Sequence, residues 1–231
     1  MSAPAVGMSD RRAAGFYDSV VGKKVVMAVS GVVLFGYVVA HLLGNLQIFL
    51  GPDQINHYAA LLHASPPLLW TARIFLLIML FLHVWSCWLL FLQKRAARPE
   101  PYVKKRAVGS DYASRTMYWS GPIVGAFVIY HIMHLTLGVG GTPYIELHPY
   151  ENVVHGFRNP IVAGFYIVAL ILLCTHLYHG LWSMFQTLGI NHPRYTPWLK
   201  RGAQVVAILI AIGEISIPIA VLLGIVGGEI Q

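Results

Sequence analysis

The feature of this sequence that most limits its fold is a series of five long apolar stretches, each nearly free of charge. A helix needs about 20 apolar residues to cross a bilayer core of roughly 30 Å. Stretches of sufficient length cover residues 25–50, 67–93, 116–140, 158–189 and 203–227. They explain why charged residues make up only 11% of the chain, against about 25% in an ordinary soluble domain. Because only a helix satisfies its backbone hydrogen bonds within one segment in lipid, the sequence predicts an all-α membrane protein with five transmembrane helices.

Basic residues mark one side of these stretches. All 16 Lys and Arg except Arg73 and Arg158 lie before the first stretch, between the second and third, or between the fourth and fifth. By the positive-inside rule, the N-terminus is expected in the cytoplasm, the C-terminus outside, and the chain in the inner (cytoplasmic) membrane as a multi-pass protein. This topology accounts for the net charge of +7, which leaves no reason to expect a nucleic-acid partner.

The remaining segments are short. Residues 1–22 are expected to form a cytoplasmic N-terminal segment, and residues 23–231 one five-helix transmembrane domain. The N-terminal segment has neither the apolar run nor the small-residue cleavage site of a signal peptide. Turn-forming residues, such as Gly51-Pro52-Asp53 and Asn191-His192-Pro193, follow the stretches.

Histidines within the apolar stretches are the main indication of a functional site in the sequence. Six of the 11 histidines lie there: His41, His83, His131, His134, His176 and His179. One such histidine is most simply explained by a hydrogen bond between helices. Six of them over four consecutive stretches, with none in the fifth, indicate a functional site, because ionisable groups are costly at that depth.

These histidines sort into two layers. At about 1.5 Å per residue, His41 and His131 lie roughly 24–26 Å from the cytoplasmic ends of their stretches, and His83 and His176 roughly 16–20 Å. The sequence therefore predicts two stacked bis-histidine sites, His41 with His131 and His83 with His176, within the first four helices. Haem b fits an axial histidine pair between apolar walls. A zinc or copper site would need three or four converging ligands, and no Cys or carboxylate is expected nearby.

Small residues support this prediction. Ser30-Gly31 precedes His41 and Ser120-Gly121 precedes His131 at the same offset, and Gly36 and Gly125 lie further along the same helices. A flat macrocycle needs small residues where it touches a helix. The alternative is that these glycines only allow two helices to approach closely.

The order of several motifs resembles a known family. They are His41-Leu42-Leu43-Gly44-Asn45, Asn56-His57-Tyr58-Ala59, the His83 helix, Ser114-Arg115-Thr116-Met117 with Ser120-Gly121 and His131, and His176-Leu177-Tyr178-His179-Gly180-Leu181-Trp182-Ser183 continuing to Leu188-Gly189. Over roughly residues 20–225 the chain resembles the single-subunit, five-helix, di-haem cytochrome b anchors of succinate dehydrogenases and fumarate reductases.

This resemblance implies a function and a set of ligands. The four axial ligands would be His41, His83, His131 and His176. The chain would carry electrons between cytoplasmic flavoprotein and iron–sulphur subunits and a membrane quinone, with menaquinone suited to two haems across the membrane. It would be the quinone-reactive haem subunit of the enzyme, with no dicarboxylate site of its own.

Further site residues are expected near the membrane surfaces. Haem propionates need cationic or hydrogen-bonding partners. The candidates are Arg115, Arg158 and Lys24, with interfacial snorkelling as the alternative for each. The candidates for a quinone pocket at the outer haem are Asn45, His57 and Arg73, and a pocket around Ser30 and the start of the third helix is the inner-side alternative. Glu214, inside the fifth stretch, is either a proton-transfer group or a protonated carboxyl bonded to a neighbouring helix.

Two other functions fit parts of the pattern. One is the haem b anchor of another membrane oxidoreductase, such as a hydrogenase or formate dehydrogenase. The other is a transporter whose buried histidines relay protons. Transporters commonly have repeat-related halves and broken helices, whereas five stretches with no histidine in the last show neither pattern.

Overall fold

The computed structural model describes residues 15–97, 112–139, 141 and 143–228, and within these residues every regular element is a helix. In chain order the elements are η1 (Phe16–Asp18), α1 (Val20–Asn45), η2 (Leu46–Leu50), α2 (Pro52–His63), α3 (Pro66–Ala96), α4 (Tyr112–Leu135), α5 (Pro149–Phe157), α6 (Pro160–Thr187) and α7 (Thr196–Leu222). The predicted all-α class is thus confirmed for the described residues.

Four of these helical segments are long and apolar enough to cross a membrane. They are Val20–Leu50, which joins α1 to η2, and helices α3, α6 and α7. In α4 the apolar part is shorter, from Trp119 to Leu135. The structure therefore supports a multi-pass membrane protein with four candidate spans.

Local chemistry explains where the helices begin. The hydroxyl of Ser19 accepts a hydrogen bond from the backbone N–H of Gly22 at 2.8 Å, which caps α1. Asn159 caps α6 in the same way, by accepting from the N–H of Ile161. Gly51, at φ +104°, makes the turn from η2 into α2, a conformation that favours glycine.

The element bounds differ from the expected ones in several places. Helix α1 begins at Val20, within the expected N-terminal segment 1–22, and α7 ends at Leu222 rather than 227. The segments expected as loops contain α2 and α5, each of which begins with a proline at its first turn. The third expected stretch ends at Leu135 rather than 140, and Gly138 turns the chain at φ +65° soon after. The last helix begins at Thr196 rather than 203, because the charges taken as a boundary lie within its first turns.

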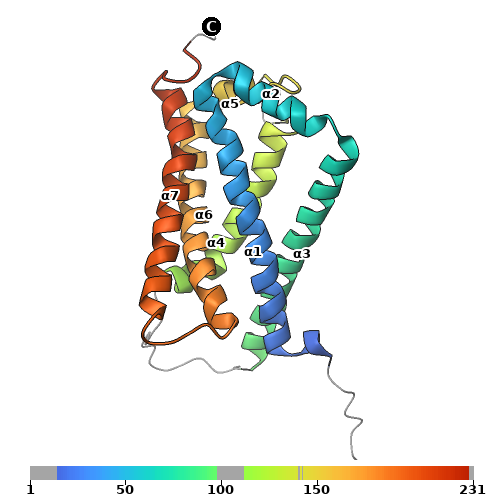
Figure 1. The fold of residues 1–231 in the computed structure, drawn as a ribbon, viewed down its shortest axis with the longest axis vertical. Helices are drawn as coiled ribbons and strands as arrows, with labels where there is room; N and C mark the ends of the chain where they lie inside the picture. The colour runs from blue at the N-terminus through green and yellow to red at the C-terminus, as the bar shows by residue number, and fades with distance from the viewer. Residues whose placement is uncertain (1–14, 98–111, 140, 142, 229–231) are drawn as a thin grey trace, which may run out of the picture.

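The long helices form two groups (Figure 1). Helix α1 packs along α3, and α6 packs along both α7 and α4. Helix α1 also contacts α6, which joins the groups. The short helices α2 and α5 lie together over one end of the bundle, at the top of Figure 1, which we call the capped end. The opposite end, where α1 begins, we call the N-terminal end.

Close side-chain packing is concentrated on one side of the bundle. The larger core cluster joins α4, α5, α6 and α7 and includes Val154, Tyr166 and Ile217. A smaller cluster of Leu42, Cys174 and Ile210 joins α1, α6 and α7. Neither cluster contains a residue of α3, so α3 lies outside both cores.

Hydrogen bonds hold the capped end together. The amide of Asn56 in α2 donates to Glu151 in α5 at 3.0 Å, and its oxygen accepts from the N–H of Tyr150. The Tyr150 hydroxyl accepts from the N–H of Gly227, whose carbonyl accepts from Arg158 at 2.8 Å. The segment after α7 is therefore tied to α5 and to the start of α6.

Apart from Arg73 and Arg158, the basic residues of the described chain gather at the N-terminal end, where α1, α4 and α7 begin and α3 and α6 end. Lys200 lies there with its ammonium group 4.1 Å from the ring centroid of Trp182. The basic residues Arg11, Arg12, Arg98, Lys104, Lys105 and Arg106 lie outside the described residues.

Candidate functional site

The six membrane histidines lie on the four helices that border the space between the two groups. His41 is on α1, His83 on α3, His131 and His134 on α4, and His176 and His179 on α6. The rings of His41 and His131 lie 5.7 Å apart between centroids, with an angle of 84° between their planes. Those of His83 and His176 lie 6.2 Å apart at 64°. We call them the 41/131 pair and the 83/176 pair.

These separations fit two imidazoles on opposite sides of one metal ion. With metal–nitrogen bonds of about 2.0 Å, the ring centroids of two such ligands would lie about 6 Å apart. The helices of each pair do not pack along one another in the described chain, neither α1 with α4 nor α3 with α6. The ring pairs therefore bridge gaps between helices. A flat macrocycle around each metal ion would need such gaps.

The 83/176 pair is held through the backbone of α1. Nδ1 of His83 lies 3.0 Å from the carbonyl oxygen of Met27. Since a carbonyl only accepts, this nitrogen carries the proton and Nε2 has a free lone pair for a metal. A Cβ at Gly31 would lie 3.2 Å from Cε1 of His83, so glycine allows the ring to approach α1.

The 41/131 pair is held by aromatic rings. Tyr37 stacks on His41 at 5.5 Å and 23°. Phe127 and Tyr166 each lie 5.9 Å from the ring of His131. Nδ1 of His131 is buried and has no hydrogen-bond partner among the described residues, so ring packing orients this side chain.

The two remaining membrane histidines face other groups. His134 is 2% exposed, and its Nδ1 lies 2.9 Å from the Tyr166 hydroxyl. His179 packs edge-on against Trp182 with ring centroids 5.4 Å apart. The structure thus brings the first histidine of each closely spaced couple to a histidine on another helix, and places the second among aromatic residues.

The glycines differ in their surroundings. A Cβ at Gly31 would meet His83, whereas a Cβ at Gly36, Gly121 or Gly125 would have no described atom within 4 Å. The last three do not serve helix–helix contact among the described residues. Their open faces are compatible with a cofactor or with lipid.

The propionate candidates lie at both ends of the bundle. Arg115 and Lys24 are exposed near the starts of α4 and α1, at the N-terminal end. Arg158, at the capped end, is also exposed and donates to the carbonyl of Gly227. Arg158 therefore already has a role in holding the segment after α7.

The three candidate residues for a quinone pocket differ in burial and in their contacts. Asn45 is half-buried at the end of α1, and His57 is exposed on α2. The guanidinium group of Arg73 lies over the Trp70 ring at 5.2 Å and interacts electrostatically with Tyr37, the tyrosine stacked on His41. Arg73 is thus the candidate that the structure connects to the 41/131 pair.

Sequence reasoning missed three groups at this site: Tyr37, Tyr166 and the carbonyl of Met27. Tyr37 lies one helical turn before His41, so its spacing was a usable signal. Tyr166 reaches His131 from another helix, and a backbone carbonyl leaves no trace in the sequence.

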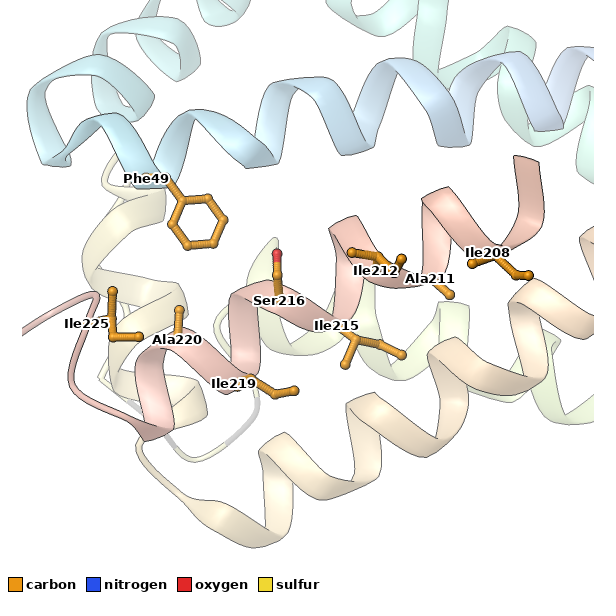
Figure 2. A pocket seen from close by; sticks show the side chains of 9 residues that line it. All are labelled: Phe49, Ile208, Ala211, Ile212, Ile215, Ser216, Ile219, Ala220 and Ile225. Carbon is orange, nitrogen blue, oxygen red and sulfur yellow. The ribbon is translucent and has the colours of Figure 1, made fainter. Parts of the chain in front are cut away.

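A separate hollow lies against one face of α7 (Figure 2). It has a volume of about 600 Å³ and is lined by Phe49, Ile225 and a face of α7. Its one hydroxyl, of Ser216, donates to the carbonyl of Gly213 in its own helix. The hollow contains none of the histidines and suits an apolar chain of lipid. Glu214, nearby on α7, is half-buried and interacts electrostatically with Cys174 of α6.

The donor set suits haem better than a bare metal ion. Within the described residues, no three side chains of His, Cys, Asp or Glu converge as a tetrahedral metal site would require. Two neutral imidazoles on opposite sides, with apolar walls around them, are the donors that a low-spin haem iron takes. No family model matches the chain, and neither a curated protein nor a solved structure matches it.

Proposed function

We propose that this chain is the cytochrome b membrane anchor of a succinate:quinone oxidoreductase. The observation that carries the proposal is the pairing of four half-buried histidines. Their rings lie 5.7 and 6.2 Å apart across helices that otherwise do not pack together. The choice of this enzyme family rests on the sequence motifs that resemble the di-haem anchors of succinate dehydrogenases and fumarate reductases.

In this proposal each histidine pair holds one haem b. When bound, haem supplies a one-electron carrier that needs no proton at the iron. The backbone carbonyl of Met27 keeps the proton of His83 on Nδ1, so that Nε2 can bind. Tyr37 and Phe127 pack on His41 and His131 and keep water from these rings.

The topology is part of the proposal. Helix α4 has 24 residues and is about 36 Å long at 1.5 Å per residue, enough for a fifth span. Five spans place the N-terminus in the cytoplasm and the C-terminus outside the inner membrane. The 83/176 pair then lies nearer the cytoplasmic side, and Arg115 and Lys24 lie on that side as propionate partners.

The partners follow from this orientation. Flavoprotein and iron–sulphur subunits dock on the basic N-terminal end and deliver electrons to the 83/176 haem. A haem held by His41 and His131 would supply the electron carrier next to a menaquinone site at the capped end, where Arg73 and Asn45 would supply polar groups and His57 lies on the adjoining α2. Arg158 serves as the propionate partner on this side.

The test is to purify the chain from its native membrane under mild conditions and add succinate. The proposal predicts co-purifying flavoprotein and iron–sulphur subunits and succinate-dependent reduction of a b-type haem. Reduction by hydrogen or formate instead would identify the anchor of another oxidoreductase. A protein without any visible haem band would exclude an electron-transfer function and leave a transporter.

A further inference from the structure

A buried histidine, His134, lies one helical turn beyond the half-buried His131 in α4. His134 and Tyr166 are each 2% exposed, and Nδ1 of His134 lies 2.9 Å from the Tyr166 hydroxyl. Gly156 of α5 makes room for the imidazole, because a Cβ there would lie 2.6 Å from Cε1 of His134. The two side chains therefore form an interhelical hydrogen bond, α4 to α6, inside the larger core.

Packing alone does not explain why a histidine occupies position 134. Nε2 of His134 is buried and has no hydrogen-bond partner among the described residues. An unsatisfied buried polar atom costs stability, and an apolar side chain of similar size would avoid that cost. What histidine adds at this position is the bond to the Tyr166 hydroxyl.

Tyr166 in turn contacts the proposed axial ligand. Its ring centroid lies 5.9 Å from that of His131, at an angle of 58°. Phe157 and Phe127 pack against other parts of the Tyr166 ring, with centroids 4.8 and 5.3 Å away. The ring of Tyr166 thus contacts both His134 and His131.

As a proposed metal ligand, His131 needs neighbouring groups that fix its ring plane. A metal-binding histidine ordinarily donates its second ring nitrogen to an acceptor, which fixes the ring plane. His83 has this anchor in the Met27 carbonyl, whereas Nδ1 of His131 has no such partner among the described residues. The plane of His131 nevertheless stands at 84° to that of His41.

We propose that His134 and Tyr166 are positioning residues that fix the ring plane of His131 and thereby keep the two axial planes of the 41/131 site nearly perpendicular. The inference rests on the proposed function, because it concerns a haem ligand. Perpendicular imidazole planes make the two iron d orbitals that they contact nearly equal in energy. The ferric haem then gives a strongly anisotropic low-spin EPR spectrum.

The first test compares Tyr166→Phe with the wild-type complex. This change removes the hydroxyl and keeps the ring, so the helix packing stays filled. We expect both haems to be retained, the EPR anisotropy of the 41/131 haem to fall, and its midpoint potential to shift. The signal of the 83/176 haem stays as it was. The two signals are assigned with His41→Ala and His83→Ala, each of which removes one.

The matched control is Tyr130→Phe. Tyr130 lies in the same core and stacks on His134 at 5.5 Å, but its hydroxyl bonds to no described residue. We expect Tyr130→Phe to leave both EPR signals and both potentials unchanged.

His134 supplies a second pair of variants. Asn places an amide near the position of Nδ1 and can keep the bond to Tyr166, whereas Leu cannot. We expect His134→Leu to reproduce the shift of Tyr166→Phe, His134→Asn to restore most of the wild-type spectrum, and the double variant His134→Leu, Tyr166→Phe to add nothing further.

Two results would overturn the inference. One is a lower thermal stability in Tyr166→Phe and His134→Leu with unchanged EPR spectra and potentials, which would mean that the pair only stabilises the core. The other is an equal change in both haem signals. A wild-type protein without haem would instead overturn the proposed function.

Discussion

The two histidine pairs have similar ring separations but different supports. In the 83/176 pair, the backbone of α1 anchors His83 through the Met27 carbonyl, and Gly31 sets how closely the ring approaches. In the 41/131 pair, side chains of three helices surround the rings, and the hydrogen bond between His134 and Tyr166 supplies the only polar anchor that we find among the described residues near His131. The first site therefore depends on the spacing of two helices, and the second on side-chain packing.

The largest expected effect comes from removing a ligand. His83→Ala or His176→Ala should remove one haem, and His41→Ala or His131→Ala the other, because a single imidazole leaves the iron without its second axial bond. Haem content measured as the pyridine haemochrome should fall to half in each variant. The EPR signal that is lost should be the same for both members of a pair and different between pairs.

His179→Ala is the control for this series. Its ring packs edge-on against Trp182 of the same helix. We expect it to keep both haems. If His179→Ala lost a haem while His176→Ala kept both, the ligand on α6 would be the later histidine, contrary to the pairing described above.

The next effect concerns the backbone-supported pair. In Gly31→Ala the new Cβ would lie 3.2 Å from Cε1 of His83 and push the ring off the Met27 carbonyl. We expect weaker binding of the 83/176 haem, measured as faster haem loss on dilution into detergent, with the 41/131 haem unaffected.

Gly164→Ala is the control for Gly31→Ala. A Cβ at Gly164, on α6, would meet no described atom within 4 Å. Both substitutions favour the helix by up to about 1 kcal/mol, so only the contact with His83 distinguishes them. Equal haem retention in Gly31→Ala and Gly164→Ala would remove the case for a spacing role of Gly31.

The two histidine pairs also show which features of the site could be predicted from the sequence. Depth along the helices predicted which helices supply each pair, because position along a helix follows from residue number. The choice of His131 and His176 came from the family resemblance. Spacing could not separate His131 from His134, which lie on nearly the same face of α4. The difference comes from Tyr166, a partner on another helix, and such long-range contacts are invisible to a local pattern.

The fold, like the site, could be predicted only in part from the sequence. The apolar stretches predicted the long helices, but α2 and α5 were expected as loops because their sequences contain turn-forming and polar residues. The start of α7 was placed too late, at 203, because Lys200 and Arg201 were taken to lie outside the helix. Charges are tolerated in the first turns of a membrane helix, where the side chains reach the interface.

A smaller effect is expected in the basic segment between α3 and α4, which lies outside the described residues. Replacing Lys104, Lys105 and Arg106 together with Gln should weaken the docking of the succinate-oxidising subunits, because a cationic surface attracts an acidic partner over about 8 Å at physiological salt. Subunit retention on washed membranes should fall as salt rises, and reduction of the 83/176 haem by succinate should slow. Full retention at all salt concentrations, with the orientation unchanged, would leave these residues only a topological role.

The smallest effect is expected at the capped end. Arg158→Gln removes the bond to the Gly227 carbonyl, and because this side chain is exposed the loss should be about 1 kcal/mol, or about 2–4 °C in Tm. A shift in the potential of the 41/131 haem would show that Arg158 also contacts a propionate. A lower Tm with unchanged potentials would limit it to holding the segment after α7.

The central claim is that each histidine pair binds one haem b, and the most direct measurement is the number of haems per purified chain. The pyridine haemochrome, divided by protein from quantitative amino-acid analysis, should give two haems b per polypeptide in the wild type. A redox titration of the same sample should resolve two components. One haem or none per chain in protein purified from its native membrane would contradict the account.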